Sequence, residues 1–149
     1  MAAAEKKNSH ADAQREYFRS RVSVFLQPIP EKILARTKKI AESAGLNEGS
    51  QVIDVGTGTG ALIVHFLELG VKQENITGVD LSEEMLKNAR ERLPKVNFIR
   101  ADILDADTVI GKANQFDAVF FNACFGNIFD QRLALKKTHA PLRSGGSII

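Results

Sequence analysis

The chain of 149 residues contains one cysteine, Cys124, and no tryptophan. A single cysteine cannot form an internal disulfide, which favours a reducing compartment. No apolar run approaches the ~18 residues of a membrane-spanning helix, and the first ten residues, MAAAEKKNSH, lack the apolar region of a secretory signal. We therefore expect a cytoplasmic protein without a membrane partner, and leave open an organellar protein after processing.

The chain also has little excess charge of either sign, and its histidines do not form a metal-binding pattern. The 20 Lys and Arg residues face 18 Asp and Glu residues, which gives a formal net charge of +2. So small an excess is not the basic footprint of a nucleic-acid-binding protein, and we expect no such partner. The three histidines, His10, His65 and His139, do not show the spacing of metal ligands, so no metal site is predicted.

Short apolar runs alternate with helix-like segments through the last two-thirds of the chain. Strands are expected at residues 51–56, 75–80, 96–102, 116–122 and 145–149, and helices within 61–70, 82–93 and 129–142. Such alternation predicts parallel strands joined by right-handed helical crossovers, and therefore an α/β fold of three layers.

The residues before the first strand predict a helical arm. One helix is expected at about 11–25 and a second at 30–46, where apolar residues recur near one stripe, at Ile33, Leu34, Ile40 and Ala44. We therefore divide the chain into an N-terminal helical arm, 1–45, and an α/β domain, 46–149.

Three glycines in five positions follow the first expected strand, in the sequence DVGTGTGA (54–61). A phosphate-binding P-loop needs a lysine that is absent between Gly56 and Lys72. The dinucleotide pattern G-x-G-x-x-G/A does fit, with Asp80 as its downstream acid. Asp54, however, would repel a pyrophosphate and attract a cation. An NAD-linked oxidoreductase is therefore the less favoured alternative.

Five segments in order resemble the motifs of the class I, Rossmann-like S-adenosylmethionine-dependent methyltransferases. They are VIDVGTGTG (52–60), GVDLSEEML (78–86), IRADILD (99–105), FDAVFFNACFGNIFD (116–130) and LRSGGSII (142–149). The resemblance implies a parallel sheet ordered 3-2-1-4-5, S-adenosylmethionine as cofactor, and methyl transfer to a small-molecule acceptor. The family sheet has seven strands, so we expect a domain that lacks the last two.

The resemblance also implies a role for the glycine-rich loop. Gly56, Thr57, Gly58 and Gly60 would bring backbone close to the amino-acid part of the cofactor. Asp54 would supply negative charge beside it.

The ends of the next three strands complete the implied cofactor site. Asp80 would accept hydrogen bonds from both ribose hydroxyls, and Leu81 would pack on the adenine. Asp102 would accept from the adenine amino group, with Ile103 beside the ring. Asn122 would offer its backbone carbonyl to the ammonium group.

No catalytic residue can be assigned from these motifs. Many small-molecule members of the family carry a histidine after the fourth strand, where this chain has Asn127, and an asparagine cannot act as a general base. Phe125 is a candidate wall of the pocket and Cys124 a candidate small buried residue. A non-catalytic cofactor- or partner-binding module is the alternative function, and the incomplete sheet edge predicts self-association or a poorly ordered carboxyl end.

Overall fold

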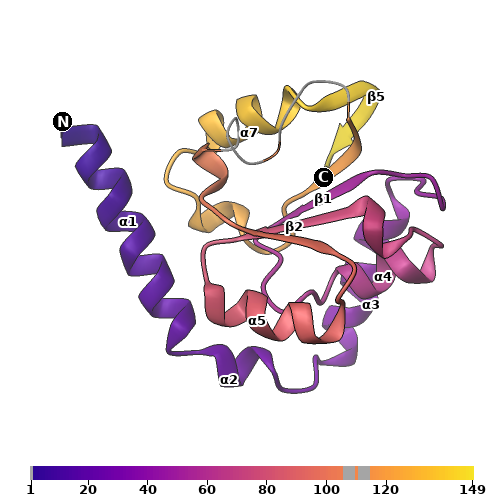
Figure 1. The fold of residues 1–149 in the computed structure, drawn as a ribbon, viewed down its shortest axis with the longest axis horizontal. Helices are drawn as coiled ribbons and strands as arrows, with labels where there is room; N and C mark the ends of the chain where they lie inside the picture. The colour runs from indigo at the N-terminus through magenta and orange to yellow at the C-terminus, as the bar shows by residue number, and fades with distance from the viewer. Residues whose placement is uncertain (1, 106–109, 111–114) are drawn as a thin grey trace.

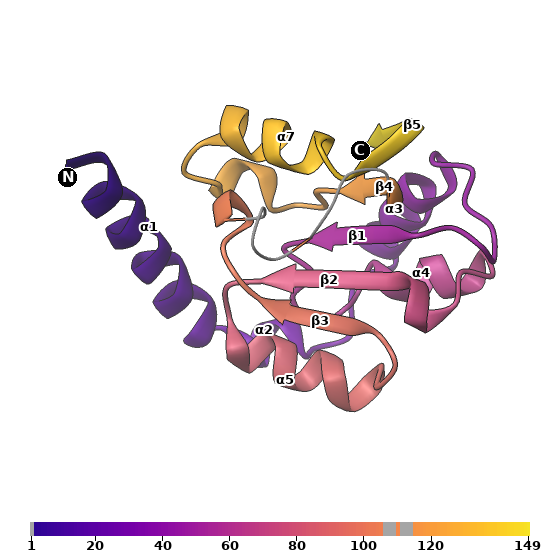
Figure 2. The same cartoon turned by 45° about the horizontal axis from the view of Figure 1, so that its top comes forward.

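Five parallel strands form the centre of the molecule. The computed structural model describes residues 2–105, 110 and 115–149. Its strands lie in the order β3-β2-β1-β4-β5, and all four neighbouring pairs are parallel, which confirms the predicted fold class and order (Figure 2). Their bounds are β1 (Val52–Val55), β2 (Ile76–Asp80), β3 (Asn97–Arg100), β4 (Phe116–Phe120) and β5 (Leu142–Ile148).

Helices cover both faces of this sheet, as Figure 1 shows. One face packs against α3 (Glu31–Glu42), α4 (Ile63–Glu68) and α5 (Glu83–Arg92), and the other against α7 (Gln131–His139). Alternate strand residues point to the two cores: Val52 and Ile76 belong to the first, Ile53 and Val79 to the second. Apolar residues on both sides of a strand are typical of a parallel sheet with two covered faces.

Side-chain caps determine where two of the helices begin. The Ser82 hydroxyl accepts a hydrogen bond from the Met85 backbone N–H at the start of α5, and the Asp130 carboxylate accepts one from the Leu133 N–H at the start of α7. Such caps satisfy backbone donors that a first helical turn leaves unpaired. The described connections also contain three 3₁₀ turns: η1 (Gln73–Asn75), η2 (Ile103–Asp105) and η3 (Phe125–Asn127).

The N-terminal arm differs from the prediction. Instead of one helix at 11–25, the arm contains α1 (Ala2–Arg19) and α2 (Val22–Phe25). The helix ends where the Ser20 hydroxyl and the Arg21 guanidinium both donate to the Tyr17 carbonyl, in competition with the regular helical pattern. In Figures 1 and 2, α1 extends along the side of the domain at which the strands end.

The predicted apolar stripe of α3 is wrong in its first half. Ile33 and Leu34 are 50% and 37% exposed, whereas Thr37 and Ala41 are buried. Only the later turns of α3 pack against the domain, where Ile40 lies against the first core together with Ala44, which follows the helix. The division into an arm, 1–45, and a domain, 46–149, stays a prediction.

Strand β5 begins earlier than predicted, because it contains a bulge. Phe116 pairs with Leu142, but Ala118 pairs with Ser147, and Gly145 within the extra length has a φ of +81°. Glycine reaches this conformation without steric cost, which lets the strand resume pairing after the bulge.

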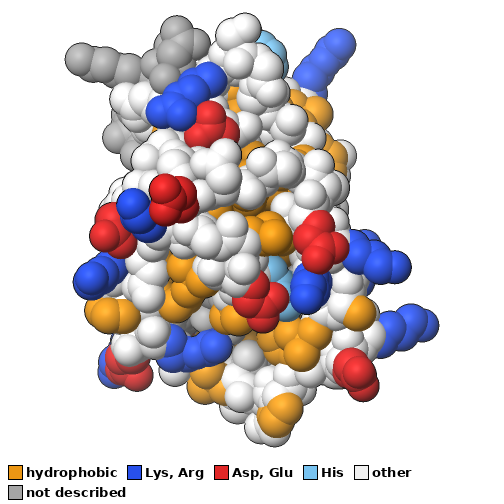
Figure 3. Space-filling view, turned by 90° about the vertical axis from the view of Figure 1, so that its right-hand side faces the viewer, with side chains coloured by type: hydrophobic (Ala, Val, Ile, Leu, Met, Phe, Trp, Pro, Cys, Tyr) orange, Lys and Arg blue, Asp and Glu red, His pale blue; other side chains and the backbone are white. Residues whose placement is uncertain are grey.

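Asp117 joins the amino ends of three strands. Its carboxylate accepts from the Gln51 backbone N–H at 2.7 Å and, through both oxygens, from Arg143 of β5 at 2.9 and 3.0 Å. At the amino ends of the strands, the surface of the molecule carries basic and acidic side chains intermixed around apolar patches (Figure 3). None of the described helices has the length and apolar character needed to cross a membrane.

Candidate functional site

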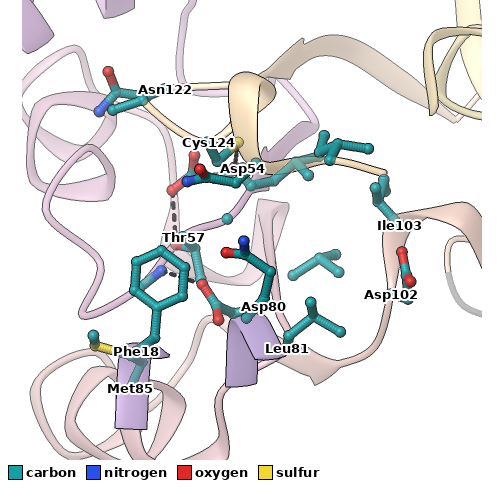
Figure 4. Close-up of a pocket in the computed structure, with 18 of the residues that line it drawn as sticks. Phe18, Asp54, Thr57, Asp80, Leu81, Met85, Asp102, Ile103, Asn122 and Cys124 are labelled. Carbon is teal, nitrogen blue, oxygen red and sulfur yellow. Dashed lines mark hydrogen bonds between the residues drawn. The ribbon is translucent and has the colours of Figure 1, made fainter. Parts of the chain in front are cut away.

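A cleft of about 240 Å³ lies at the carboxyl ends of the strands, the position at which ligands bind in open α/β sheets. Nine of the ten predicted cofactor-binding residues line it: Asp54, Gly56, Thr57, Gly58, Asp80, Leu81, Asp102, Ile103 and Asn122 (Figure 4). Gly60 is the exception, since it packs away from the cleft against Leu93. The structure thus brings the predicted residues together, while their binding roles stay predictions.

The three glycines of the loop after β1 have different surroundings. All have positive φ, at +66°, +55° and +83° for Gly56, Gly58 and Gly60, a conformation that disfavours other residues. A Cβ on Gly56 would lie 2.4 Å from the Cβ of Cys124, and one on Gly60 would lie 3.0 Å from Leu93. A Cβ on Gly58 would meet nothing within 4 Å. Gly56 and Gly60 therefore leave room for side chains of the protein itself, whereas the backbone of Gly58 is open to the cleft.

Asp54 is a buried acid behind this loop. It is 1% exposed, and its Oδ2 accepts a hydrogen bond of 2.7 Å from the Thr57 hydroxyl. Burial raises the pKa of Asp54 to about 7. The hydrogen bond from Thr57 acts in the opposite direction and lowers this pKa, whereas the negative charge of the nearby Asp80 raises it further. A cation in the cleft would relieve this cost by favouring the ionised form.

Asp80 presents a carboxylate that is held at both oxygens. Oδ2 accepts from the Gly58 N–H at 2.8 Å, and Oδ1 accepts from the Ser82 N–H at 2.9 Å. Burial raises the pKa of Asp80, and hydrogen bonds from backbone N–H groups oppose that rise. A carboxylate oxygen can accept two hydrogen bonds, so each oxygen keeps capacity for a ligand. Backbone contacts therefore fix the orientation of the Asp80 carboxylate and leave it able to accept further hydrogen bonds.

The loops after β3 and β4 form the remaining walls of the cofactor region. Asp102 Oδ1 accepts from the Leu104 N–H at 2.9 Å, which positions the buried Ile103 at the cleft. Cys124 is half-buried, and its thiol donates to the Val55 carbonyl at 3.0 Å. Burial, and then the charges of Asp54 and Asp80, raise the pKa of the Cys124 thiol to about 12. This cysteine is therefore not a nucleophile near neutral pH.

Aromatic side chains form a further part of the cleft. Phe18, Phe25 and Phe129 line it, together with His10 and Gln14. Phe125, the aromatic residue predicted to do so, instead packs on Phe121, with ring centroids 5.3 Å apart. The signal available in the sequence was the four-residue spacing of His10, Gln14 and Phe18, which places them on one face of α1.

The described residues that line the cleft include no Lys or Arg. Carboxylates, amides and apolar side chains dominate instead. Such a lining suits a ligand with a positive charge, hydroxyl groups and a flat apolar ring, and does not suit a pyrophosphate.

Known proteins resemble the chain throughout this region. The family model described as a methyltransferase domain matches residues 52–146. A demethylmenaquinone methyltransferase from Staphylococcus aureus (strain JH9) is 27% identical over 112 residues, which cover 75% of this chain and 46% of that protein. The chain thus spans about half the length of the curated relatives it matches.

Solved structures agree with the family match. The 1,6-didemethyltoxoflavin-N1-methyltransferase of Burkholderia thailandensis, solved with S-adenosylhomocysteine, aligns with a TM-score of 0.72 at 24% identity, over 95% of this chain and 62% of that one. The MccD protein aligns with a TM-score of 0.66 at 25% identity, over 76% and 50%. Together with the strand order, the family match shows that the chain belongs to the class I, Rossmann-like methyltransferases, the family whose cofactor is S-adenosylmethionine.

Proposed function

We propose that the chain binds S-adenosylmethionine in this cleft and takes part in transfer of its methyl group to a small-molecule acceptor. The observation that carries the proposal is a pair of acids, the buried Asp54 and the half-buried Asp80, at the ends of adjacent central strands in a cleft whose described lining includes no Lys or Arg. Two such acids destabilise each other until a cation or a donor group arrives.

The residues present match the groups of this cofactor. Asp80 is placed to accept from two adjacent hydroxyls, because both of its oxygens keep an acceptor site beside the open backbone of Gly58. Leu81 and Ile103 provide apolar surface for a purine, and Asp102 keeps a second oxygen for an exocyclic amine. Asp54 supplies the negative charge that an ammonium group needs.

The chain's own contribution to methyl transfer is positioning and exclusion of water. Bound S-adenosylmethionine supplies the methyl group and leaves as a neutral thioether. Apolar side chains that include Phe18, Phe25 and Phe129 line the same cleft. Desolvation of this kind favours a reaction in which charge on sulfur disappears, and alignment of the acceptor reduces its entropic cost.

Calorimetric titration tests the binding proposal. We expect S-adenosylmethionine and S-adenosylhomocysteine to bind and NAD to bind far more weakly. The variant Asp80→Asn keeps one acceptor oxygen and loses the charge, so it should weaken cofactor binding by about 1.5–3 kcal/mol, or about 10- to 150-fold. Glu91→Gln on the exposed side of α5 is the matched control and should bind as the wild type does. Tight NAD binding, or equal cofactor affinity in the folded Asp80→Asn variant, would refute the assignment.

A further inference from the structure

Five titratable side chains of the described residues line the cleft, and one of them lies outside the cofactor region, where it can take a proton from an acceptor. Three are the acids Asp54, Asp80 and Asp102 of the cofactor region, and the fourth is Cys124, whose thiol stays protonated near neutral pH. The fifth is His10, from the middle of α1. Imidazole is the side chain whose ordinary titration range makes it an efficient base near neutral pH.

The position of His10 is set by contacts on both sides of the cleft. Three residues earlier, Lys7 pairs with Asp105 after β3 at 2.6 Å. His10 itself lies against Phe129, with ring centroids 5.5 Å apart, and its Nε2 lies 2.7 Å from the Asn127 carbonyl oxygen. These contacts dock α1 against the ends of two strands and turn one of its faces toward the cleft.

The contact with Asn127 determines which nitrogen of His10 carries the proton. A backbone carbonyl oxygen can only accept a hydrogen bond, so Nε2–H must donate, and Nδ1 is left with a free lone pair. A carbonyl acceptor of this kind fixes both the tautomer and the orientation of the ring. The helix α1 thus brings an imidazole to the loop after β4 from a distant part of the chain.

We propose that His10 Nδ1 is the general base of the reaction and that the acceptor is a neutral aromatic molecule with a hydroxyl group. The aromatic class follows from Phe129, whose ring lies against His10, and from Phe18 and Phe25, which add flat apolar surface elsewhere in the same cleft. A described lining without Lys or Arg disfavours an anionic acceptor, and the acids of the cleft, which would attract a cation, belong to the cofactor region. This inference rests on the proposed function and adds a base and a substrate class to it.

The step balances without a further reactant. The hydroxyl oxygen of the acceptor forms a bond to the methyl carbon as the bond between that carbon and sulfur breaks, and the bonding electrons return to sulfur. The hydroxyl proton moves to His10 Nδ1, and the resulting imidazolium loses a proton to solvent after the methylated product leaves.

Two naphthalene probes at pH 7.5 separate a base from a structural contact. With 2-naphthol the hydroxyl must lose its proton, whereas 2-naphthalenethiol is already ionised to a large extent and needs no base. We expect His10→Gln to lower kcat for 2-naphthol by about 100-fold or more, with KM changed little, and to leave the thiol reaction within a few-fold of wild type. The exposed His139→Gln on α7 is the matched control and should lower neither rate.

A nitrogen NMR measurement gives a readout that does not need turnover. In ¹⁵N-labelled protein, His10 should show a protonated Nε2 and an unprotonated Nδ1, and binding of 2-naphthol should shift the Nδ1 resonance. Binding of 2-methoxynaphthalene, which has no proton to share, should leave that resonance nearly unchanged.

The outcomes distinguish this inference from the proposed function. If the wild type does not bind S-adenosylmethionine in calorimetry, the proposed function fails. If the cofactor binds but 2-naphthol is not methylated, or His10→Gln slows both probes equally, the base assignment is overturned while cofactor binding stands. A protonated Nδ1 in the NMR measurement would overturn it as well.

Discussion

The buried carboxyl group of Asp54 should make the folded protein lose stability as the pH rises. Its pKa is 3.8 when unperturbed and about 7 in the fold, so the folded state binds a proton that the unfolded state has released. Stability from this group is fully present below about pH 4 and is lost as the pH rises to about 7. A shift of about 3 pKa units corresponds to about 4 kcal/mol of unfolding free energy.

The variant Asp54→Asn removes this pH-dependent contribution to the free energy of unfolding and changes little else. The amide oxygen of asparagine can still accept the hydrogen bond from the Thr57 hydroxyl, and the side chain has almost the same size. Urea unfolding followed by circular dichroism, at several values between about pH 4 and pH 8, gives the free energy of unfolding for both proteins. The wild type should lose up to about 4 kcal/mol relative to the variant across that range. Parallel curves for the two proteins would refute a strongly raised pKa.

Two further predictions concern the contact between the loops after β1 and β4. Gly56→Ala should destabilise the fold by about 1–3 kcal/mol more than Gly58→Ala, because both positions have positive φ but only the first would bring a Cβ to 2.4 Å from Cys124; equal losses in urea unfolding would contradict this packing. Cys124 should resist iodoacetamide at pH 8 in the folded protein and react once urea unfolds it, because its pKa is raised to about 12; rapid labelling of the folded chain, measured by mass spectrometry, would show that its thiolate is accessible.

The parts of the fold that depend on local signals could be predicted from the sequence. The helix expected within 82–93 is close to the observed Glu83–Arg92, because its signals are local: Ser82 caps its start and Pro94 follows its end. The apolar run at 75–80 likewise became β2, Ile76–Asp80. In each case, the residues that determine the element lie within it or beside it.

The failures involve contacts between distant segments. The exposure of Ile33 and Leu34 depends on how far α3 extends beyond the domain, which its own periodicity does not reveal. The start of β5 depends on a bulge that is defined only by its pairing with β4.

The candidate site likewise has features that the sequence predicts and features that depend on contacts between distant segments. Parallel pairing predicted that the carboxyl ends of β1 to β4 lie at one edge of the sheet, and the acids there do meet in one cleft. The place of Phe129 in the cleft could not be predicted, because it depends on the docking of α1, which brings His10 against this ring. The glycine pattern was recognised, but it did not reveal that Cys124 occupies the space beside Gly56.

The hydrogen bond between Asp117 and Gln51 bears on how this sheet assembles during folding. It joins residues 66 positions apart, at the junction of the two central strands. Each of the pairs β1–β2 and β2–β3 closes through one short helical connection, but β1 exposes its other edge until β4 has been made and docked. Contacts of such high sequence separation slow folding, because the chain loses entropy before the contact forms. We therefore expect the partly folded chain to carry an open, apolar strand edge that is prone to aggregation.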